Sequence, residues 1–121
     1  MIQGVRTVIY PVRDLAKATG WYSAAFGCEP YFNQPYYVGY AVGGFELGLV
    51  PDGEPGRQGC IAYWGVDKID EEVSRMVALG ASLHKAVQEV GEAIRVAELL
   101  DPDGNQIGLI ENPQFDPAAV R

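Results

Sequence analysis

The feature that most constrains this chain is an internal repeat, because a duplicated unit has to fold in the same way twice. Residues 8–27 are matched by residues 62–80. Val12 corresponds to Val66, an offset of 54 residues, and Leu15 corresponds to Ile69 with the same offset. In each copy a strand-like run leads into apolar residues spaced at the period of an amphipathic helix. We therefore expect a strand followed by a helix in both copies.

The ends of the two predicted helices carry typical capping residues. The helices are expected over residues 16–26 and 70–79, with Asp14 and Asp67 as N-caps and Gly27 and Gly80 as left-handed C-caps.

Each copy continues into a predicted hairpin. In the first copy, residues 36–40 and 45–50 flank Gly43-Gly44, a strong two-residue turn signal. In the second copy, residues 93–100 and 106–110 flank the turn 101–105, Asp-Pro-Asp-Gly-Asn. Gly48 then corresponds to Gly108, an offset of 60 residues. The chain is predicted to be βαβββ twice over.

The length of 121 residues favours a single domain. We expect a first module over residues 1–50, a Pro- and Gly-rich linker over 51–59, a second module over 60–111 and a loose tail over 112–121. Neither module has enough apolar residues to be stable alone. Two half-sheets sharing a centre, with helices on the outer faces, satisfy both amphipathic patterns and place the chain in the α+β class.

The net charge and the lack of long apolar runs argue against nucleic acid and membranes as partners. The formal charge of −7 makes nucleic acid an improbable partner, because binding it depends on basic residues. No apolar run approaches the roughly 20 residues needed to cross a bilayer. Cys28 and Cys60 form no CxxC pair, and the N-terminus lacks the regions of a signal peptide, so reduced thiols in the cytoplasm are expected.

Several motifs in order resemble the glyoxalase, bleomycin-resistance and extradiol-dioxygenase superfamily, also called vicinal oxygen chelate proteins. They are the Val12-Arg13-Asp14-Leu15 opening with Trp21-Tyr22 and Phe26-Gly27, the Trp64-Gly65-Val66-Asp67 opening, and the run from Asp101 to Glu111. Residues 35–40 are also similar to a bacterial subgroup of small glyoxalase-like proteins without an agreed activity. The resemblance implies paired βαβββ modules that form a U-shaped mixed sheet around a cleft, often in a homodimer.

In metal-dependent members, the resemblance places His or Glu ligands on the first and last strands of each module. The equivalent positions here are Thr7, Gly48, Ile61 and Gly108, none of which carries a strong metal ligand. An alternative register puts Glu46 and Cys60 on ligand positions, which still supplies only two ligands. We therefore expect no metal and no other cofactor.

Other side chains are candidates for binding or catalysis. Strand alternation places Glu46 toward the cleft, either as a ligand-orienting group or base, or as a rim carboxylate in water. The strand tyrosines either pack in the core or form a stacking wall for a planar or cationic ligand. Cys60 is expected in the core, and the lone His84 is expected to face solvent. The predicted ligand-binding set is Thr7, Ile9, Tyr36, Tyr40, Glu46, Gly48, Ile61, Tyr63, Gln106 and Gly108.

The leading hypothesis is a metal-independent protein of this superfamily that binds a small molecule and acts by sequestration or sensing. The alternative is a lyase, isomerase or dioxygenase with an atypical, weak metal site at Glu46 and Cys60. A purely structural or interaction role is the third possibility. The identity of the ligand cannot be read from the sequence, because one fold hosts many chemistries.

Overall fold

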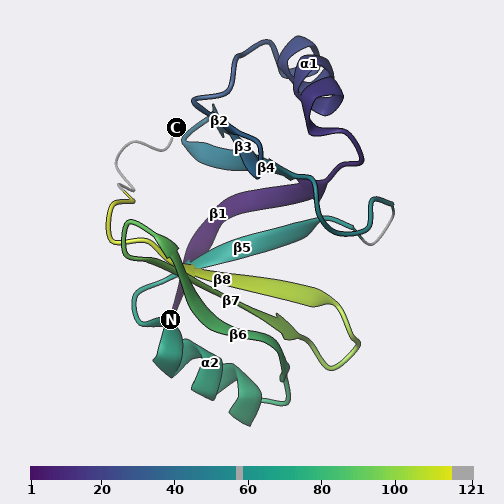
Figure 1. Cartoon of the computed structure of the whole chain (residues 1–121). Helices are drawn as coiled ribbons and strands as arrows, with labels where there is room; N and C mark the ends of the chain where they lie inside the picture. Colours follow the sequence, from purple (N-terminus) through teal and green to yellow (C-terminus); the bar gives the residue numbers. More distant parts are fainter. Residues whose placement is uncertain (57–58, 116–121) are drawn as a thin grey trace. The chain divides into compact units, whose positions relative to one another are not determined.

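The computed structural model describes residues 1–56 and 59–115 and confirms the α+β class (Figure 1). Within these residues, two helices and eight strands follow one another in the predicted βαβββ-βαβββ order. Their bounds are β1 (Ile2–Pro11), α1 (Leu15–Phe26), β2 (Phe32–Gln34), β3 (Tyr37–Val42), β4 (Phe45–Val50), β5 (Ile61–Val66), α2 (Ile69–Ala78), β6 (Ser82–Gly91), β7 (Ile94–Leu100) and β8 (Gln106–Glu111).

The chain divides into two compact units. Of the described residues, 7–56 and 59–61 form one unit, here the N-terminal unit, and 1–6 together with 62–115 form the other, the C-terminal unit. Strand β1 therefore contributes its first half to the C-terminal unit and its second half to the N-terminal unit. Strands lie in the order β2-β3-β4-β1 in the N-terminal unit and β1-β5-β8-β7-β6 in the C-terminal unit.

Strand registers confirm both repeat offsets. The first strand of each module pairs in parallel with the last, with Ile9 opposite Gly48 and Tyr63 opposite Gly108. The third and fourth strands of each module form an antiparallel hairpin. Gly43 and Gly44 both have positive φ angles, 59° and 90°, which the two-residue turn requires.

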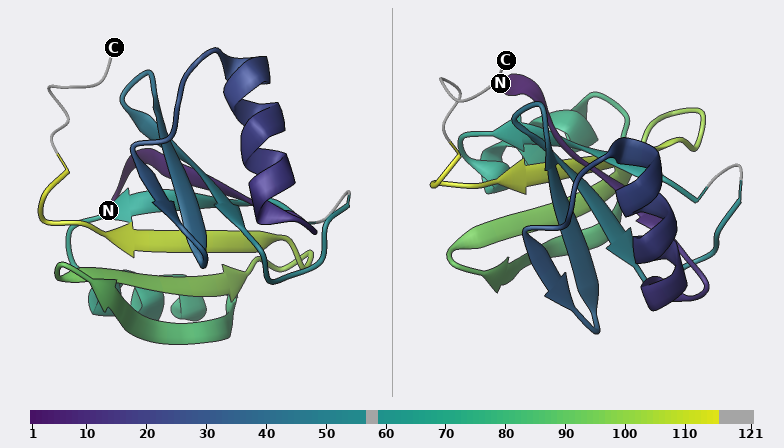
Figure 2. Two further views of the ribbon diagram at one scale, coloured as in Figure 1. Left: turned by 45° about the horizontal axis from the view of Figure 1, so that its top comes forward. Right: turned by 90° about the horizontal axis from the view of Figure 1, so that it is seen from above.

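In the N-terminal unit, α1 packs against β3 and β4 (Figure 2). Val38, Tyr40, Leu47 and Leu49 are buried from the strands, and Leu15, Ala18 and Tyr22 of α1 pack against them. The predicted caps are confirmed: the Asp14 side chain accepts a hydrogen bond from the Lys17 backbone N–H at 3.1 Å, and Gly27 is left-handed. These caps fix where the helix begins and ends.

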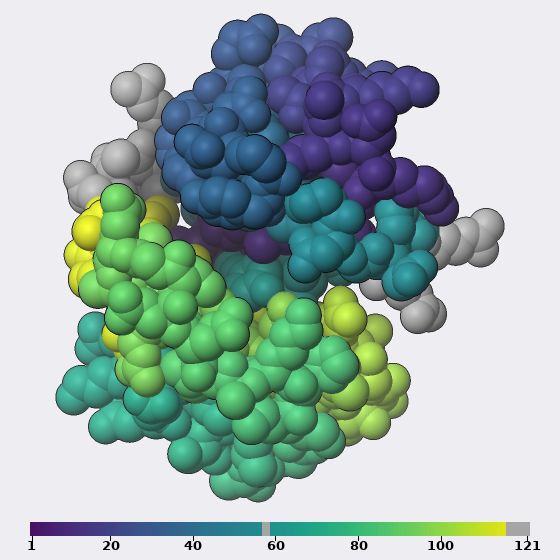
Figure 3. All heavy atoms as spheres, in the orientation of Figure 1, coloured from purple at the N-terminus to yellow at the C-terminus, as the bar shows by residue number. Residues whose placement is uncertain are grey.

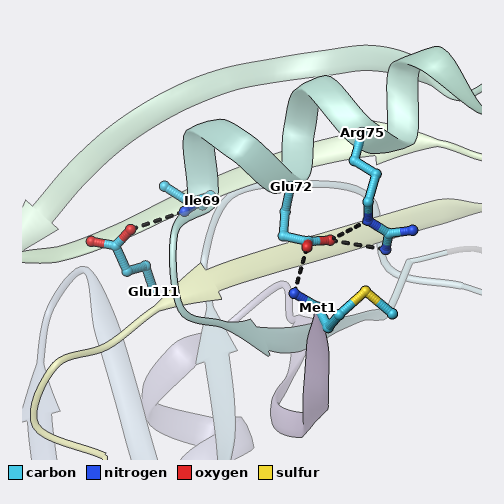
Figure 4. Close-up of polar contacts among 5 residues, drawn as sticks. All are labelled: Met1, Ile69, Glu72, Arg75 and Glu111. Atoms are coloured by element: carbon cyan, nitrogen blue, oxygen red, sulfur yellow. Dashed lines mark hydrogen bonds and ion pairs between the residues drawn. The ribbon is translucent and has the colours of Figure 1, made fainter.

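In the C-terminal unit, α2 covers one face of β6, β7 and β8 (Figures 1 and 2). Its core consists of Val66, Ile69, Ala97, Leu99 and Leu109. The expected N-cap at Asp67 is wrong, because Lys68 holds that position and makes no side-chain capping bond. Glu111 of β8 instead accepts the Ile69 backbone N–H at 2.9 Å (Figure 4). A strand residue 42 positions away in the sequence thus satisfies the free N–H group of the helix.

Glu72 of α2 is a buried charged residue of this unit. Its carboxylate accepts two hydrogen bonds from the Arg75 guanidinium, at 3.1 and 2.9 Å, and lies 2.7 Å from the Met1 ammonium (Figure 4). These partners lower the pKa of Glu72, with the Arg75 hydrogen bond as the largest cause and the ammonium hydrogen bond next. The carboxylate therefore stays ionised although it is buried.

Three peripheral features complete the fold. Strand β6, at one edge of the sheet, is exposed along almost its whole length (Figure 3), and His84 on it faces solvent as expected. Cys60 is exposed, so its expected place in the core is wrong; it lies just before β5, outside the ladder that buries Ile61. In residues 1–56 and 59–115, no helix is both long and apolar enough to cross a membrane.

Candidate functional site

The candidate site begins on the face of β1 and β4 that points away from α1. Thr7 lies opposite Glu46 in the parallel register, and Ile9 lies opposite Gly48. Thr7 is buried, and Glu46 is half-buried. Leu47 and Leu49 alternate with Glu46 and face the helix, so strand alternation directs the carboxylate to the other face.

Glu46 is the centre of a tyrosine–carboxylate cluster, which we define as Tyr31, Tyr37 and Glu46. The Tyr31 hydroxyl donates a hydrogen bond to one carboxylate oxygen, and the Tyr37 hydroxyl donates to the other. Tyr31 lies in the loop before β2 and is tied to β3 by a 3.0 Å bond from its backbone N–H to the Gly39 carbonyl. Hydrogen bonds to an ionised acceptor are stronger than neutral ones, so the cluster holds both rings in place.

Glycines create the space that the cluster occupies. A Cβ atom at Gly48 would lie 2.7 Å from Cζ and 2.9 Å from Cε1 of Tyr37. At Gly39 it would lie 3.2 Å from Tyr37 Cε2 and 3.3 Å from Tyr31 Cε1. The phenol ring of Tyr37 therefore fills the volume into which a side chain at Gly48 would project.

The C-terminal unit fills its equivalent position in a similar way. A Cβ atom at Gly108 would lie 2.6 to 2.8 Å from three ring atoms of Tyr63. The Tyr63 hydroxyl donates a 2.7 Å hydrogen bond to Glu98, and Lys85 lies 3.8 Å from the same carboxylate oxygen. Burial, and then the bond to Glu98 and its negative charge, raise the pKa of Tyr63 well above the usual tyrosine range. Tyr63 therefore remains a neutral hydrogen-bond donor.

The predicted binding residues do not all lie at one place in the structure. Thr7, Ile9, Glu46 and Gly48 lie together in the N-terminal unit, where Ile61 is also buried, and Tyr63 and Gly108 lie together in the C-terminal unit. Gln106 is exposed at the start of β8, opposite Leu100.

Two of the predicted tyrosines lie elsewhere. Tyr40 is fully buried among the core residues that pack on α1, and its hydroxyl bonds the Thr19 carbonyl at 2.9 Å and the Ser23 hydroxyl at 3.0 Å. Its assignment to the binding face is wrong. Tyr36 is 65% exposed in the turn before β3, with its ring against Phe32.

Tyr31 and Tyr37 are absent from the binding set predicted from the sequence, although both belong to the tyrosine-rich segment before and within the first hairpin. For Tyr37 a signal was present: the two-residue turn pairs Val42 with Phe45, and this register puts Gly39 opposite Gly48. Counting back from that pair places Tyr37 on the face of Glu46 and Tyr40 on the opposite face. Tyr31 precedes β2 and has no strand register, so no local pattern pointed to it.

The sequence was compared with known families and proteins. The family profile described as the glyoxalase-like domain matches residues 7–110. The chain belongs to this family. Among curated proteins there is no significant match.

Solved structures support the same superfamily fold. Streptomyces coelicolor methylmalonyl-CoA epimerase, in complex with 2-nitronate-propionyl-CoA, superposes with a TM-score of 0.76 at 15% identity, covering 96% of this chain and 99% of the epimerase. A glyoxalase/bleomycin resistance protein/dioxygenase superfamily member from Vibrio splendidus gives 0.68 at 18% identity, covering 93% of this chain and all (100%) of that one. A Legionella pneumophila chain described as an NAD-dependent benzaldehyde dehydrogenase gives 0.69 at 18%, covering 87% and 96%. At these identities the likeness establishes the fold alone.

The superfamily's metal-dependent members raise the question of whether the residues present fit a metal. Thr7 and Ile61 offer at most one weak hydroxyl ligand, and the space beside Gly48 and Gly108 is filled by tyrosine rings. Glu46 is the single carboxylate among these positions, and its two oxygens accept phenol hydrogen bonds. Within residues 1–56 and 59–115, no group of three or more His, Cys, Asp or Glu side chains is arranged to hold an ion. The donor set of these positions does not fit a divalent metal.

Proposed function

We propose that this glyoxalase-like protein binds a small molecule without a metal, through the tyrosine–carboxylate cluster, and acts by sequestration or sensing. The observation that supports this most is the position of Tyr37. Its ring takes the place of a side chain at Gly48, and its hydroxyl is bonded to Glu46. At Gly48, where the family resemblance places a metal ligand, the chain therefore has an aromatic ring beside a carboxylate, which suits an organic ligand.

The chemistry of the cluster indicates the class of ligand. Tyr31 is 63% exposed and Tyr37 is half-buried, so at least one aromatic ring is accessible for stacking. Glu46 supplies a negative charge beside both rings. A planar molecule with a cationic or N–H donor group would stack on a ring and donate to one of the lone pairs of the carboxylate that the two phenols leave open, since a carboxylate offers about four such sites. A small-molecule partner of this kind is the one we propose.

The test measures metal content and binding on the same preparation. Protein purified without chelators is expected to contain metal far below one ion per chain. A panel of planar cationic and neutral compounds is screened by thermal shift, because a ligand at 100 times its Kd stabilises the fold by about 2.7 kcal/mol. Glu46→Gln and Tyr37→Phe should reduce the shift of any hit, and Tyr36→Phe, which alters an exposed turn tyrosine, should not.

Two results would contradict the proposal. Stoichiometric, tightly bound Zn, Ni, Mn or Fe would favour the alternative of a metal-dependent lyase, isomerase or dioxygenase. Hits that are insensitive to Glu46→Gln and Tyr37→Phe would remove the cluster from the binding site. The homodimer is a separate prediction, and light scattering tests it.

A further inference from the structure

A separate hollow lies in the C-terminal unit, and none of its lining residues belongs to the tyrosine–carboxylate cluster. It has a volume of about 330 Å³, within the range of small-molecule sites. The residues that matter for its chemistry are Arg6 from β1, Gly65 and Asp67 at the end of β5, Glu111 at the end of β8, and Asn112 and Phe115 after it.

Arg6 is the cation of this hollow. Its side chain crosses β5 at Gly65, where a Cβ atom would lie 2.6 Å from its Nε and 2.8 Å from its Cζ. Its Cζ atom lies 3.8 Å from the centre of the Phe115 ring, a cation–π contact that holds the guanidinium in a fixed plane. The tail expected to be loose is therefore anchored at Phe115, and the residues beyond it lie outside the described part of the chain.

The hydrogen-bonding capacity of Arg6 is largely unused. Its two recorded bonds, to the Val5 carbonyl at 3.4 Å and to Gln3 at 3.5 Å, are at the outer limit of hydrogen bonding. Within residues 1–56 and 59–115 it forms no ion pair. A half-buried, oriented guanidinium of this kind matches the two oxygens of a carboxylate.

The two carboxylates of the hollow, Glu111 and Asp67, differ in how many bonding partners they have. Glu111 accepts the Ile69 N–H at 2.9 Å and lies 3.9 Å from Arg95, so it belongs to the framework. Asp67 is exposed and has no ion pair in the part of the chain that the structure describes. The hollow thus presents one uncommitted cation and one uncommitted anion. A dianionic phosphate would be repelled by the two carboxylates, whereas a molecule with both charges is complementary.

We propose that this hollow binds a small zwitterionic carboxylate, with its carboxylate on Arg6 and its ammonium on Asp67. The apolar part of the ligand lies against Ile110, Pro113 and Phe115, which line the same hollow. The site is additional to the tyrosine–carboxylate cluster, and no residue is shared between them.

The test is an NMR titration that follows the backbone amides of Gly65, Asp67 and Asn112. The probes are two zwitterionic isomers that differ in charge separation, L-norleucine and ε-aminohexanoate, with hexanoate and hexylamine as single-charge controls. We expect at least one zwitterion to shift these amides and to bind about tenfold more tightly than either control, because each control leaves one charge unmatched. Inorganic phosphate should not compete.

Substitutions test separately the proposed contact of the ligand carboxylate with Arg6 and that of the ligand ammonium with Asp67. Arg6→Gln should weaken zwitterion binding about tenfold or more, and Asp67→Asn should make the zwitterion and hexanoate bind equally. Arg13→Gln, which removes an exposed arginine outside the hollow, should change neither. Melting temperatures verify that each variant is folded.

The proposal is overturned if neither zwitterion shifts the pocket amides, if Arg6→Gln leaves the affinity unchanged, or if hexanoate binds as tightly as the zwitterions to the unmodified chain. These outcomes are independent of the cluster, because neither the observed amides nor the variants involve Tyr31, Tyr37 or Glu46.

Discussion

Adding a single methyl group at Gly48 tests whether the Tyr37 ring occupies the position we assign to it. The backbone of Gly48 is not in the left-handed region, so Gly48→Ala introduces no strain in φ. The new Cβ would lie 2.7 and 2.9 Å from two ring atoms of Tyr37, closer than real Cβ atoms come. Tyr37 must therefore shift, although its hydroxyl is bonded to Glu46 and its ring centre lies 6.2 Å from that of Phe32.

The expected cost follows from these contacts. Inserting a methyl group into an occupied site costs about 1–3 kcal/mol, and the loss of chain entropy in the unfolded state returns about 0.4–1 kcal/mol. If the phenol also leaves Glu46, a charge-assisted hydrogen bond worth about 1.5–3 kcal/mol is weakened. We expect a net destabilisation of about 2 kcal/mol, or roughly 8 °C in Tm for a chain of this size.

The assay is a double-mutant cycle in urea. Tyr37→Ala removes the ring, so Gly48→Ala should cost little in that background, and the coupling energy should be about 1–2 kcal/mol. Gly20→Ala is the matched control: no heavy atom lies within 4 Å of its added Cβ, and the change should stabilise α1 by about 0.5–1 kcal/mol. Our reasoning is refuted if Gly48→Ala stabilises the chain as Gly20→Ala does, or if the cycle is additive to within about 0.5 kcal/mol.

Three further outcomes are expected. Because the folded state lowers the pKa of Glu72 below 4.5, its stabilisation is present above that pH and is lost on acidification; Glu72→Gln should destabilise the chain by about 1–2 kcal/mol in urea at neutral pH, and the difference should shrink below about pH 4. Glu98→Gln should lower the pKa of Tyr63 but leave it above the usual tyrosine value, since burial is the main cause; an ultraviolet titration compared with Tyr63→Phe measures this, and an unchanged Tyr63 titration would contradict it. Cys60 should react with a thiol reagent faster than Cys28, and equal rates would conflict with their different exposure.

Features that depend on interactions between residues close in the sequence were predictable, and features that depend on distant residues were not. The α1 caps Asp14 and Gly27 and the Gly43-Gly44 turn were predictable, because each acts on backbone groups a few residues away. The N-cap of α2 was not: Glu111 supplies the acceptor from a strand, and Asp67 has no such role.

In the candidate site, too, some residues were predictable from local patterns and others were not. Glu46 and Gly48 were predicted on one face because side chains alternate along a strand, and Thr7 was added by the family resemblance; the register places Thr7 opposite Glu46. For Tyr40 the expectation was wrong: the turn register pairs it with Leu47, and both side chains face the core that packs on α1.

The sequence by itself therefore determined the duplicated βαβββ order, the two offsets that relate the modules, and the absence of strong metal ligands at the positions that the family resemblance indicates. The tertiary structure decided which side chains meet: Tyr31 on Glu46, Tyr63 over Gly108, and Phe115 on Arg6. The physical reason is that the spacing of apolar and polar residues within one segment determines whether it forms a helix or a strand and which face it buries. The convergence of side chains from a loop, a strand and a tail depends on packing between distant segments, which no local pattern encodes.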